Sequence, residues 1–315
     1  MPFTTAGGSA SPATTSPVVG LLINEAKPAA VAAAETLTRA LAERGVAAVR
    51  LSPTLAERLP ERAGERRQPA TEREIAASDF VVVLGGDGTL LGAARLLAPY
   101  GTPMLGVHLG SFGFITEAHP DGLIPGVEKV LAGDCRIDER LMLAGEVFRN
   151  GDGGDGGNGG GPAPTETLLG LNDVVVASGA VRMVHVRTRI GDDDLATYAA
   201  DGVIVASPTG STGYSLSAGG PLVHPSAPVL LITPICPHTL NARTLLVPGT
   251  ETVRLTVEGS VRDVVVATVD GQIEIALHPG DTVRIRRSPH TVRLLSVGGP
   301  NFYHKIRSRW HYGER

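Results

Sequence analysis

Short apolar runs alternate with helix-forming stretches over the first hundred residues, and this alternation restricts the fold more than any other feature of the sequence. Four runs rich in branched residues read as buried strands: Pro17–Asn24, Val46–Leu51, Phe80–Leu84 and Pro103–Val107. A helix is predicted over 27–44, where apolar residues recur near helical spacing and Gly45 follows as a cap, and another runs from a glycine turn through Leu97. Strands and helices in this order imply a parallel sheet covered on both faces, and therefore a Rossmann-like α/β domain.

The character of the sequence changes after Arg140. Short β-type runs follow without a convincing long helix, which predicts an all-β, sandwich-like domain. These runs are Leu168–Ala177, Val184–Ile190, Val203–Ala206, Val229–Thr233, Val253–Val257, Val264–Val269, Ile273–Leu277 and Val283–Arg287. A basic, amphipathic stretch from Asn301 is expected to form a helix that docks back on the first domain.

We therefore expect four segments along the chain. Residues 1–16 are small and polar and are expected to be a disordered tail; residues 17–138 form the Rossmann-like domain. Residues 139–296 form the β-rich domain, and residues 297–315 form a tail that packs on the N-terminal domain. Eight glycines in eleven positions at 151–161 favour a flexible hairpin loop over a single imperfect copy of a calcium-binding repeat. The charged stretch 57–74, interrupted by prolines, is expected to be a solvated loop or frayed helix.

Composition excludes several classes of function. The 315 residues carry a net charge of −4, and a mildly acidic chain lacks the basic face that nucleic-acid or anionic-membrane binding requires. The two cysteines, Cys135 and Cys236, exclude a disulfide framework and a zinc ribbon. Neither a secretory signal nor a transmembrane run is visible. We therefore expect a cytoplasmic protein.

The strongest local signal is the segment Gly85–Thr89, which reads GGDGT directly after an apolar strand. A strand that runs through glycines into a helix exposes backbone N–H groups to an anion, and ligands of open α/β sheets bind at this end of the strands. Asp87, at the centre of the turn, can accept a proton from an attacking hydroxyl or hold a divalent metal. Alternatively, Asp87 has only a structural role and accepts hydrogen bonds from backbone N–H groups of a tight turn. The segment is neither a Walker A loop nor a dinucleotide fingerprint.

Hydroxyls and glycines alternate without a hydrophobic period from Asp201 to Pro221. Such a stretch cannot build a core, but it supplies many hydrogen-bonding groups and one aromatic face, as a nucleotide requires. A surface loop is the alternative. A third signal is Asn172-Asp173 inside the predicted strand Leu168–Ala177, where adjacent polar residues would point to opposite faces. An edge bulge would explain that pair equally well.

These motifs, in this order, resemble the motif series of the NAD kinase family, and the resemblance covers about residues 17–312. The glycine turn alone is weakly specific, since phosphofructokinases and lipid kinases share it, whereas the stretch from Pro208 to Pro221 is highly specific. The segments that carry the resemblance are Gly85–Thr89, Leu171–Asp173, Asp201-Gly202, Pro208–Thr212, Ser215–Pro221, Pro237–Arg243 and Val269–Gln272.

The resemblance implies a transferase that moves the terminal phosphate of ATP to the 2′-hydroxyl of the adenosine ribose of NAD, giving NADP. Asp87 would accept the proton of that hydroxyl, and the nucleotide-binding turn Gly85, Gly86, Gly88 and Thr89 would bind the donor phosphates. Asp173 stands where the family has Glu, and Gly213 where it has Ala. The NAD contacts implied are Asp87, Gly88, Phe114, Asn172, Asp173, His185, Asp201, Thr212, Gly213, Tyr214, Ser215, Leu216, Ser217 and Gln272.

The donor, the cofactor and the assembly also follow from the resemblance. No dedicated metal cage is visible in the sequence, so Mg²⁺ (magnesium) is expected to be held largely by the donor phosphates. Two residues before Asp201, ATP-restricted members carry Arg, whereas this chain has Ala199. Members with a small residue there often use inorganic polyphosphate as well, which suggests the same tolerance here. A homodimer or homotetramer is expected, with sites built partly by a neighbouring subunit.

Two other readings stay open at this point. A lipid kinase of the diacylglycerol or sphingoid type shares the GGDG turn and a β-rich second domain, although the polar 201–221 stretch does not suit an apolar channel. A module that senses NAD or NADP without transferring phosphate is the second alternative. The presence of Asp87 argues against it.

Overall fold

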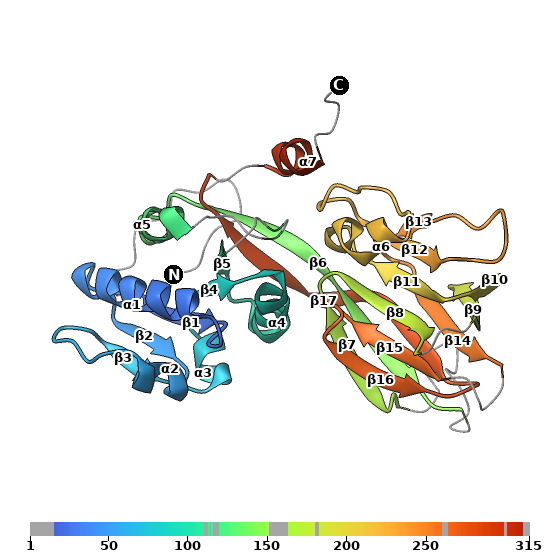
Figure 1. Ribbon diagram of the computed structural model, residues 1–315, viewed down its shortest axis with the longest axis horizontal. Helices are drawn as coiled ribbons and strands as arrows, with labels where there is room; N and C mark the ends of the chain where they lie inside the picture. Colours follow the sequence, from blue (N-terminus) through green and yellow to red (C-terminus); the bar gives the residue numbers. More distant parts are fainter. Residues whose placement is uncertain are drawn as a thin grey trace. The chain divides into compact units, whose positions relative to one another are not determined.

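A computed structural model describes residues 16–109, 113, 115, 120–150, 163–179, 183–259, 264–298 and 301–310. The chain divides into two compact units (Figure 1). The first comprises Met1–Glu139 and Thr291–Arg315, and the second comprises Arg140–His290. The expected tail up to residue 15 and the Gly-rich insert at 151–161 lie outside the described residues.

A parallel sheet forms the first unit, as the alternation of strands and helices predicted. Its strands follow the order β5-β4-β1-β2-β3, and every neighbouring pair is parallel. The end of β17 (Thr282–Ser296) adds a further parallel pairing to β5, with Leu294 opposite Met104. The other strands are β1 (Val18–Ile23), β2 (Ala48–Leu51), β3 (Arg67–Pro69), β4 (Phe80–Gly85) and β5 (Met104–His108).

Helices cover both faces of this sheet, which explains why its central strands are apolar throughout. Phe80, Val82 and Leu84 of β4 belong to a core that also contains Leu37 and Leu41 of α1, one helical turn apart. Val81 and Val83 on the other face are fully buried too. The helices of this unit are α1 (Pro28–Glu43), α2 (Pro53–Arg58), α3 (Glu72–Ala76), α4 (Asp87–Leu97), α5 (Leu123–Leu131) and α7 (Phe302–Trp310).

The charged stretch 57–74 is not the loop that its composition suggested. It contains the end of α2, all of β3 and the start of α3. Side-chain caps explain the two short helices: the Ser52 hydroxyl accepts the Leu55 N–H (3.0 Å), and Thr71 and Glu74 form a reciprocal capping box. Strand β3 lies at the sheet edge, where charged side chains are tolerated.

Two antiparallel sheets make up the second unit. One has the order β13-β12-β11-β8-β15-β16, and the other contains β10, β9, β14 and β17 with β6 and β7 beside them. Strands β6, β10 and β13 were not predicted. The bounds are β6 (Arg136–Phe148), β7 (Glu166–Gly170), β8 (Asp173–Ser178), β9 (Val184–Ile190), β10 (Asp193–Ala200), β11 (Gly202–Ala206), β12 (Val229–Ile235), β13 (Leu245–Pro248), β14 (Val253–Glu258), β15 (Val265–Val269) and β16 (Ile273–Leu277).

Residues from both sheets share one core, so the expected sandwich is confirmed. Val174 and Val176 of β8 pack in that core together with Val186 of β9 and Leu255 of β14. Val175, between them, points to the opposite face, into a smaller cluster with Ile204, Leu231 and others. The six-stranded sheet is thus buried on both faces, and its strands read as continuous apolar runs for that reason.

The predicted strand Leu168–Ala177 is wrong in one respect. The structure breaks it into β7, which ends at Gly170, and β8, which begins at Asp173. The intervening Leu171 and Asn172 form a bend rather than continuing the ladder. Their backbone N–H groups are bound by a carboxylate far away in the sequence, as described below.

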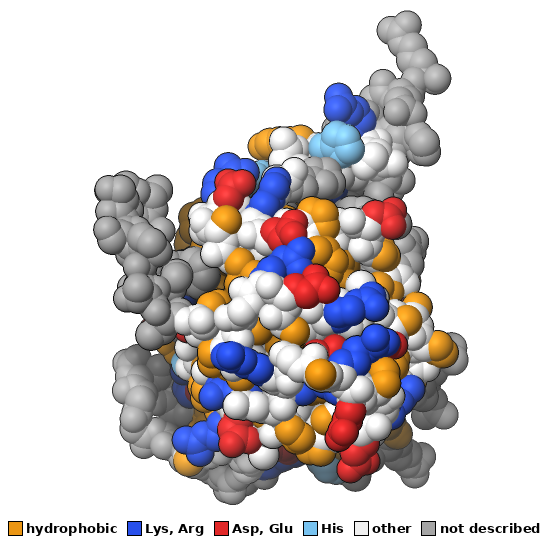
Figure 2. Space-filling model, turned by 90° about the vertical axis from the view of Figure 1, so that its left-hand side faces the viewer, with side chains coloured by type: hydrophobic (Ala, Val, Ile, Leu, Met, Phe, Trp, Pro, Cys, Tyr) orange, Lys and Arg blue, Asp and Glu red, His pale blue; other side chains and the backbone are white. Residues whose placement is uncertain are grey.

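The described surface mixes charges of both signs. On the face drawn in Figure 2, basic and acidic side chains are interspersed among apolar and polar ones. Ion pairs such as Arg62–Glu35 (2.6 Å) and Arg187–Asp194 (2.8 Å) are consistent with this mixture. Among the helices of the described residues, none is long and apolar enough to span a bilayer. The docking of the C-terminal tail on the first domain stays a prediction.

The close packing beneath β1 gives a first test. A Cβ on Gly20 would lie 2.8 Å from Val81 Cγ2 and 3.0 Å from the Ile75 carbonyl oxygen. We expect Gly20→Ala to lower the free energy of unfolding by about 1–3 kcal/mol, because two packed elements must move apart. Urea unfolding monitored by circular dichroism measures this change.

Gly126→Ala is the matched control. Gly126 is buried in α5, but its Cβ would meet Val297 and Leu105 at ordinary contact distances of 3.5 and 3.7 Å. Alanine favours the helix by about 0.5–1 kcal/mol, so this variant should be as stable as the parent or more so. Equal stability of Gly20→Ala and the parent would contradict the packing described here.

Candidate active site

The glycine turn has the strand–turn–helix geometry that the sequence predicted. Gly85 ends β4, Gly86 caps α4, and Asp87 is the first residue of that helix. The Gly86 carbonyl accepts the N–H groups of Thr89 (3.0 Å) and Leu90 (3.1 Å). Asp87 and Gly88 are exposed. A carboxylate therefore stands at a helix N-terminus, at the carboxyl edge of the parallel sheet, where the helix dipole favours negative charge.

Two glycines are required by close approach at this turn. A Cβ on Gly85 would lie 2.4 Å from Thr89 Oγ1, so the Thr89 side chain packs against the strand end. A Cβ on Gly113 would lie 1.8 Å from Asp87 Oδ1, so the Gly113 backbone lies directly against the Asp87 carboxylate. Gly113 thus forms part of the wall of the site. Phe114, predicted to contact NAD, lies outside the described residues.

His108 is a site residue that sequence reasoning missed. It ends β5, opposite Gly85 in the parallel ladder, and a Cβ on Gly86 would lie 3.9 Å from its Nε2. Its Nδ1 is buried and has no hydrogen-bond partner within the described part of the chain. A polar residue at the carboxyl end of an apolar strand was the available signal, since neighbouring parallel strands end at the same edge.

In the second unit, Asn172 and Asp173 face the same glycine. A Cβ on Gly213 would lie 3.7 Å from Asn172 Nδ2 and 4.0 Å from Asp173 Oδ2. The two side chains therefore converge, which adjacent residues of a regular strand would not do. Asn172 Oδ1 is buried without a hydrogen-bond partner in the described structure. Such an atom needs a donor, and a ligand hydroxyl would supply one.

Asp173 is held mostly protonated at acidic pH. It is only 5% exposed, and burial raises its pKa from 3.8 to about 7, with the nearby Asp270 carboxylate adding to the rise. At neutral pH this side chain exists in both forms, so it can donate a hydrogen bond or accept one.

The hydroxyl-rich stretch uses several of its own hydroxyls for structure. Ser211 Oγ bonds both backbone groups of Val223, and buried Ser215 Oγ lies 2.9 Å from Thr233 Oγ1. The Thr212 hydroxyl donates to the Thr209 carbonyl (3.1 Å). Tyr214 and Ser217 are exposed. The Thr212 hydroxyl thus stabilises the loop from within and the Ser215 hydroxyl ties it to β12, whereas the Tyr214 side chain is exposed to solvent.

The remaining predicted NAD contacts fall into two places. Exposed Gln272 follows β15 by three residues, at the strand end next to Asp173. His185 and Asp201 do not join this group. Asp201 precedes the end of β11 that pairs with Ala177, about four residues or ~14 Å along the ladder from Asp173. His185 is the second residue of β9 and lies opposite Ala199 of β10. Ala199 precedes Asp201 by two residues in the chain.

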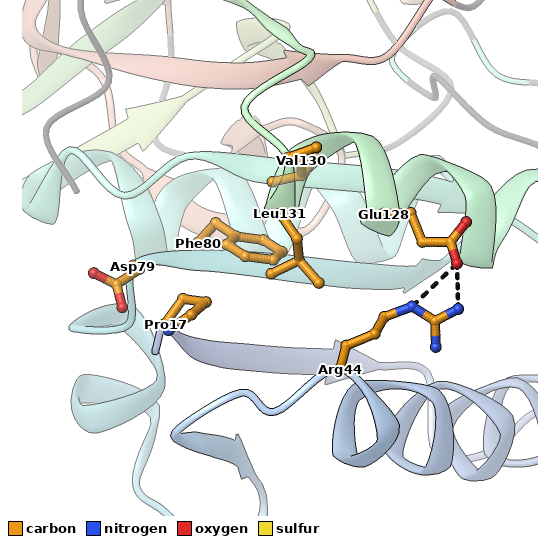
Figure 3. A pocket seen from close by; sticks show the side chains of 8 residues that line it. Pro17, Arg44, Asp79, Phe80, Glu128, Val130 and Leu131 are labelled. Carbon is orange, nitrogen blue, oxygen red and sulfur yellow. Dashed lines mark hydrogen bonds and ion pairs between the residues drawn. The ribbon is translucent and has the colours of Figure 1, made fainter. Parts of the chain in front are cut away.

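Neither a metal centre nor the apolar cavity at the start of β4 adds to these groups among the described residues. Among the described residues, no cluster of three His, Cys, Asp or Glu side chains could hold a metal ion. A cavity of about 360 Å³ (Figure 3) is lined by Pro17, Phe80, Leu131 and others, with the Arg44–Glu128 ion pair beside it. Phe80 begins β4, so this cavity lies at the opposite edge of the sheet from Gly85.

The raised pKa of Asp173 predicts how stability depends on pH. The protonated form is favoured in the folded state, so its stabilising effect is complete below pH 3.8 and is lost as the pH rises through 7. Asn at this position does not titrate. The stability of Asp173→Asn relative to the parent should therefore grow between pH 4 and pH 7, by about 4 kcal/mol at most.

Urea unfolding at pH 5, 6 and 8 checks this expectation. Asp194→Asn serves as the control, because Asp194 is exposed and its hydrogen bond from Arg187 lowers its pKa. Its relative stability should not rise over the same range. A pH-independent difference between Asp173→Asn and the parent would show that Asp173 is ionised like an ordinary carboxylate.

Comparisons with known proteins point to one family. The family model described as the ATP-NAD kinase N-terminal domain matches residues 19–135, and the model of the ATP-NAD kinase C-terminal domain matches residues 171–297. The NAD kinase of Heliobacterium modesticaldum is 42% identical over 302 residues, covering 94% of this chain and 99% of that protein. The NAD kinase of Symbiobacterium thermophilum is 41% identical over 295 residues, covering 93% and 98%.

Solved structures agree in fold. The yeast NADH kinase complexed with NADH superposes with a TM-score of 0.84 at 24% identity, covering 96% of this chain and 89% of that one. An NAD kinase from Archaeoglobus fulgidus in complex with ATP gives a TM-score of 0.69 at 23% identity, covering 92% and 99%. With the sequence matches over both units, these findings show that the chain belongs to the NAD kinase family.

Proposed function

We propose that this enzyme transfers the terminal phosphate of ATP to the 2′-hydroxyl of the adenosine ribose of NAD, with Asp87 as the proton acceptor. The observation that carries the proposal is the exposed Asp87 carboxylate at the start of α4, held against the Gly113 backbone. A ribose hydroxyl is a weak acid, so a carboxylate within hydrogen-bond reach accelerates its attack by about 10²–10⁴-fold. Phosphoryl transfer otherwise depends on positioning and on neutralising charge.

The convergence of Asn172, Asp173 and Gly213 supports a role in binding sugar hydroxyls of NAD. Asn172 Oδ1, which has no partner among the described residues, would accept a hydrogen bond from a ribose hydroxyl. Asp173 can complete the pair from the neighbouring position as donor or acceptor, since its pKa is about 7. The exposed ring of Tyr214 offers a face for the base. A ligand without these hydroxyls would leave the polar groups of Asn172 and Asp173 unpaired, and would therefore bind more weakly.

The donor phosphates are proposed to lie at the N-terminus of α4. The positive end of a helix dipole attracts anions, and exposed Gly88 leaves room for them at this helix N-terminus. His108 Nε2, beside Gly86, would add a hydrogen bond or a positive charge. A magnesium ion fits a site with one carboxylate and several phosphate oxygens, so Asp87 is the side chain that would help hold it. When bound, the ion would neutralise phosphate charge.

We also propose that the enzyme is a homo-oligomer. Within one chain, His185 and Asp201 lie away from Asn172 and Asp173. If all four residues contact NAD, His185 and Asp201 would do so in the site of a neighbouring subunit. The cytoplasmic location suggested by the composition stays a prediction.

The two alternative functions gain no support. The relatives reported above are named NAD kinase or NADH kinase, and neither a lipid kinase nor a sensing module is among them. A direct test incubates the purified protein with NAD, Mg²⁺ and ATP and measures NADP with an NADP-specific dehydrogenase. Phosphorylation of a lipid extract in place of NAD would favour the lipid kinase.

Asp87→Asn tests the proposed base. Asparagine keeps the size of the side chain but cannot accept the proton, so we expect kcat to fall at least about a hundredfold with little change in NAD affinity. Gly113→Ala keeps the carboxylate but displaces it, because the new Cβ would overlap Oδ1. It should lower kcat as well. Full turnover by Asp87→Asn would point to a different base.

The small side chain of Ala199 predicts that inorganic polyphosphate also serves as donor. Ala199 lies directly opposite His185 in the β9–β10 ladder, so an Arg there would place a second basic group beside His185. We expect the parent to form NADP with polyphosphate alone, and Ala199→Arg to lose this activity while retaining the ATP reaction. If the parent forms NADP with ATP but not with polyphosphate under the same conditions, this prediction is wrong.

A further inference from the structure

Asp270 binds the turn from which Asn172 and Asp173 project. Its carboxylate accepts three consecutive backbone N–H groups, from Leu171 (3.1 Å), Asn172 (2.7 Å) and Asp173 (3.3 Å). Its own N–H donates to the Asp173 carbonyl (3.0 Å). The side chain is 9% exposed. This cluster of bonds is what breaks the predicted strand Leu168–Ala177 at Gly170.

The same turn is held from its other side by the start of the hydroxyl-rich loop. The Ser207 N–H donates to the Asn172 carbonyl (2.8 Å), and the Ser207 hydroxyl donates to the Leu171 carbonyl (2.5 Å). A Cβ on Gly210 would lie 2.1 Å from the Asn172 carbonyl oxygen. Asp270 binds the N–H groups of the turn and Ser207 binds its carbonyl groups, so hydrogen bonds fix the backbone conformation of the turn from both sides.

The hydrogen bonds of Asp270, rather than its backbone conformation, favour a carboxylate at this position. Its φ is +51°, in the left-handed region that non-glycine residues rarely adopt. Asparagine tolerates that region at least as well as aspartate, so the backbone alone does not require Asp. Three N–H donors aimed at one side chain do favour a charged acceptor, since hydrogen bonds to a carboxylate are the strong ones.

We propose that Asp270 is a positioning residue for NAD binding, which fixes the Leu171–Asp173 turn so that Asn172 and Asp173 converge on the ligand beside Gly213. This inference rests on the proposed function of those two residues. Asp270 itself needs no contact with the ligand. Burial is the main cause of the raised pKa of Asp173, and the nearby Asp270 carboxylate adds to it.

Asp281 supplies a matched control within the same unit. It is also buried, at 2% exposed, and its carboxylate accepts the N–H groups of Asn150 (2.8 Å) and His278 (2.9 Å). Its other partner is Arg149 (2.9 Å), remote from the Asn172 group in the hydrogen-bond network. Asp281→Asn therefore removes the charge and one acceptor oxygen of a comparable buried carboxylate without changing the proposed NAD site.

Steady-state kinetics of Asp270→Asn, Asp281→Asn and Asn172→Ala, each beside its thermal unfolding temperature, test the proposal. For Asp270→Asn we expect the KM for NAD to rise about tenfold or more, with the KM for ATP unchanged and kcat within about threefold of the parent. Asp281→Asn should lower the unfolding temperature at least as much and leave the KM for NAD unchanged. A higher KM for NAD in Asp270→Asn but not in Asp281→Asn, at similar unfolding temperatures, separates a positioning role from a general loss of stability.

Three outcomes would overturn the inference, and they differ in what they say of the proposed function. If Asn172→Ala raises the KM for NAD but Asp270→Asn does not, Asp270 has no positioning role and the proposed function stands. If Asn172→Ala has no effect either, the proposed NAD site itself is wrong. If Asp270→Asn is not recovered folded, Asp270→Glu decides, since it keeps the charge but moves the oxygens by one methylene; an unchanged KM for NAD there would also overturn the inference.

Discussion

The close approach of side chains to glycine backbone at the end of β4, Thr89 against Gly85 and Asp87 against Gly113, is the constraint on which the proposed catalytic geometry depends. A strand buried on both faces must pass into a helix that packs on the same sheet, and the passage is too tight for a side chain at Gly85. The chain therefore leaves the core through glycines, and the first side chain that it offers is Asp87. With Gly113 against it, this carboxylate is fixed in place yet exposed at the helix N-terminus, where phosphates are attracted.

The β-rich unit meets a different requirement, which is to present polar side chains from a sheet whose faces are both apolar. Leu171 and Asn172 leave the ladder, and Asp270 and Ser207 replace the lost hydrogen bonds. Asn172 and Asp173 can then converge, as an unbroken strand would not allow. The proposed NAD-binding side chains thus lie where the regular sheet is interrupted, and the interruption is stabilised by residues far away in the sequence.

Local patterns were sufficient to predict the parallel sheet, the sandwich and the turn at Asp87. Buried strands and amphipathic helices leave periodic traces, and β4 and α1 show them clearly. The capped helices α2 and α3 could have been predicted from Ser52 with Pro53 and from Thr71 with Glu74, but proline and charge in 57–74 concealed them. The structure of the candidate site differs from the sequence-based expectation where contacts between residues distant in the sequence determine the conformation. The break after Gly170 depends on Asp270, about a hundred positions later, and Ser215 is satisfied by Thr233. Neither contact leaves a local signal.

The central claim is that the Asp87 carboxylate meets the sugar hydroxyl that receives the phosphate. A crystal structure of the enzyme with bound NAD tests it most directly. We expect the 2′-oxygen of the adenosine ribose within about 3 Å of a carboxylate oxygen of Asp87. A bound NAD whose 2′-oxygen lies well beyond hydrogen-bond reach of this side chain, in every subunit, would contradict it.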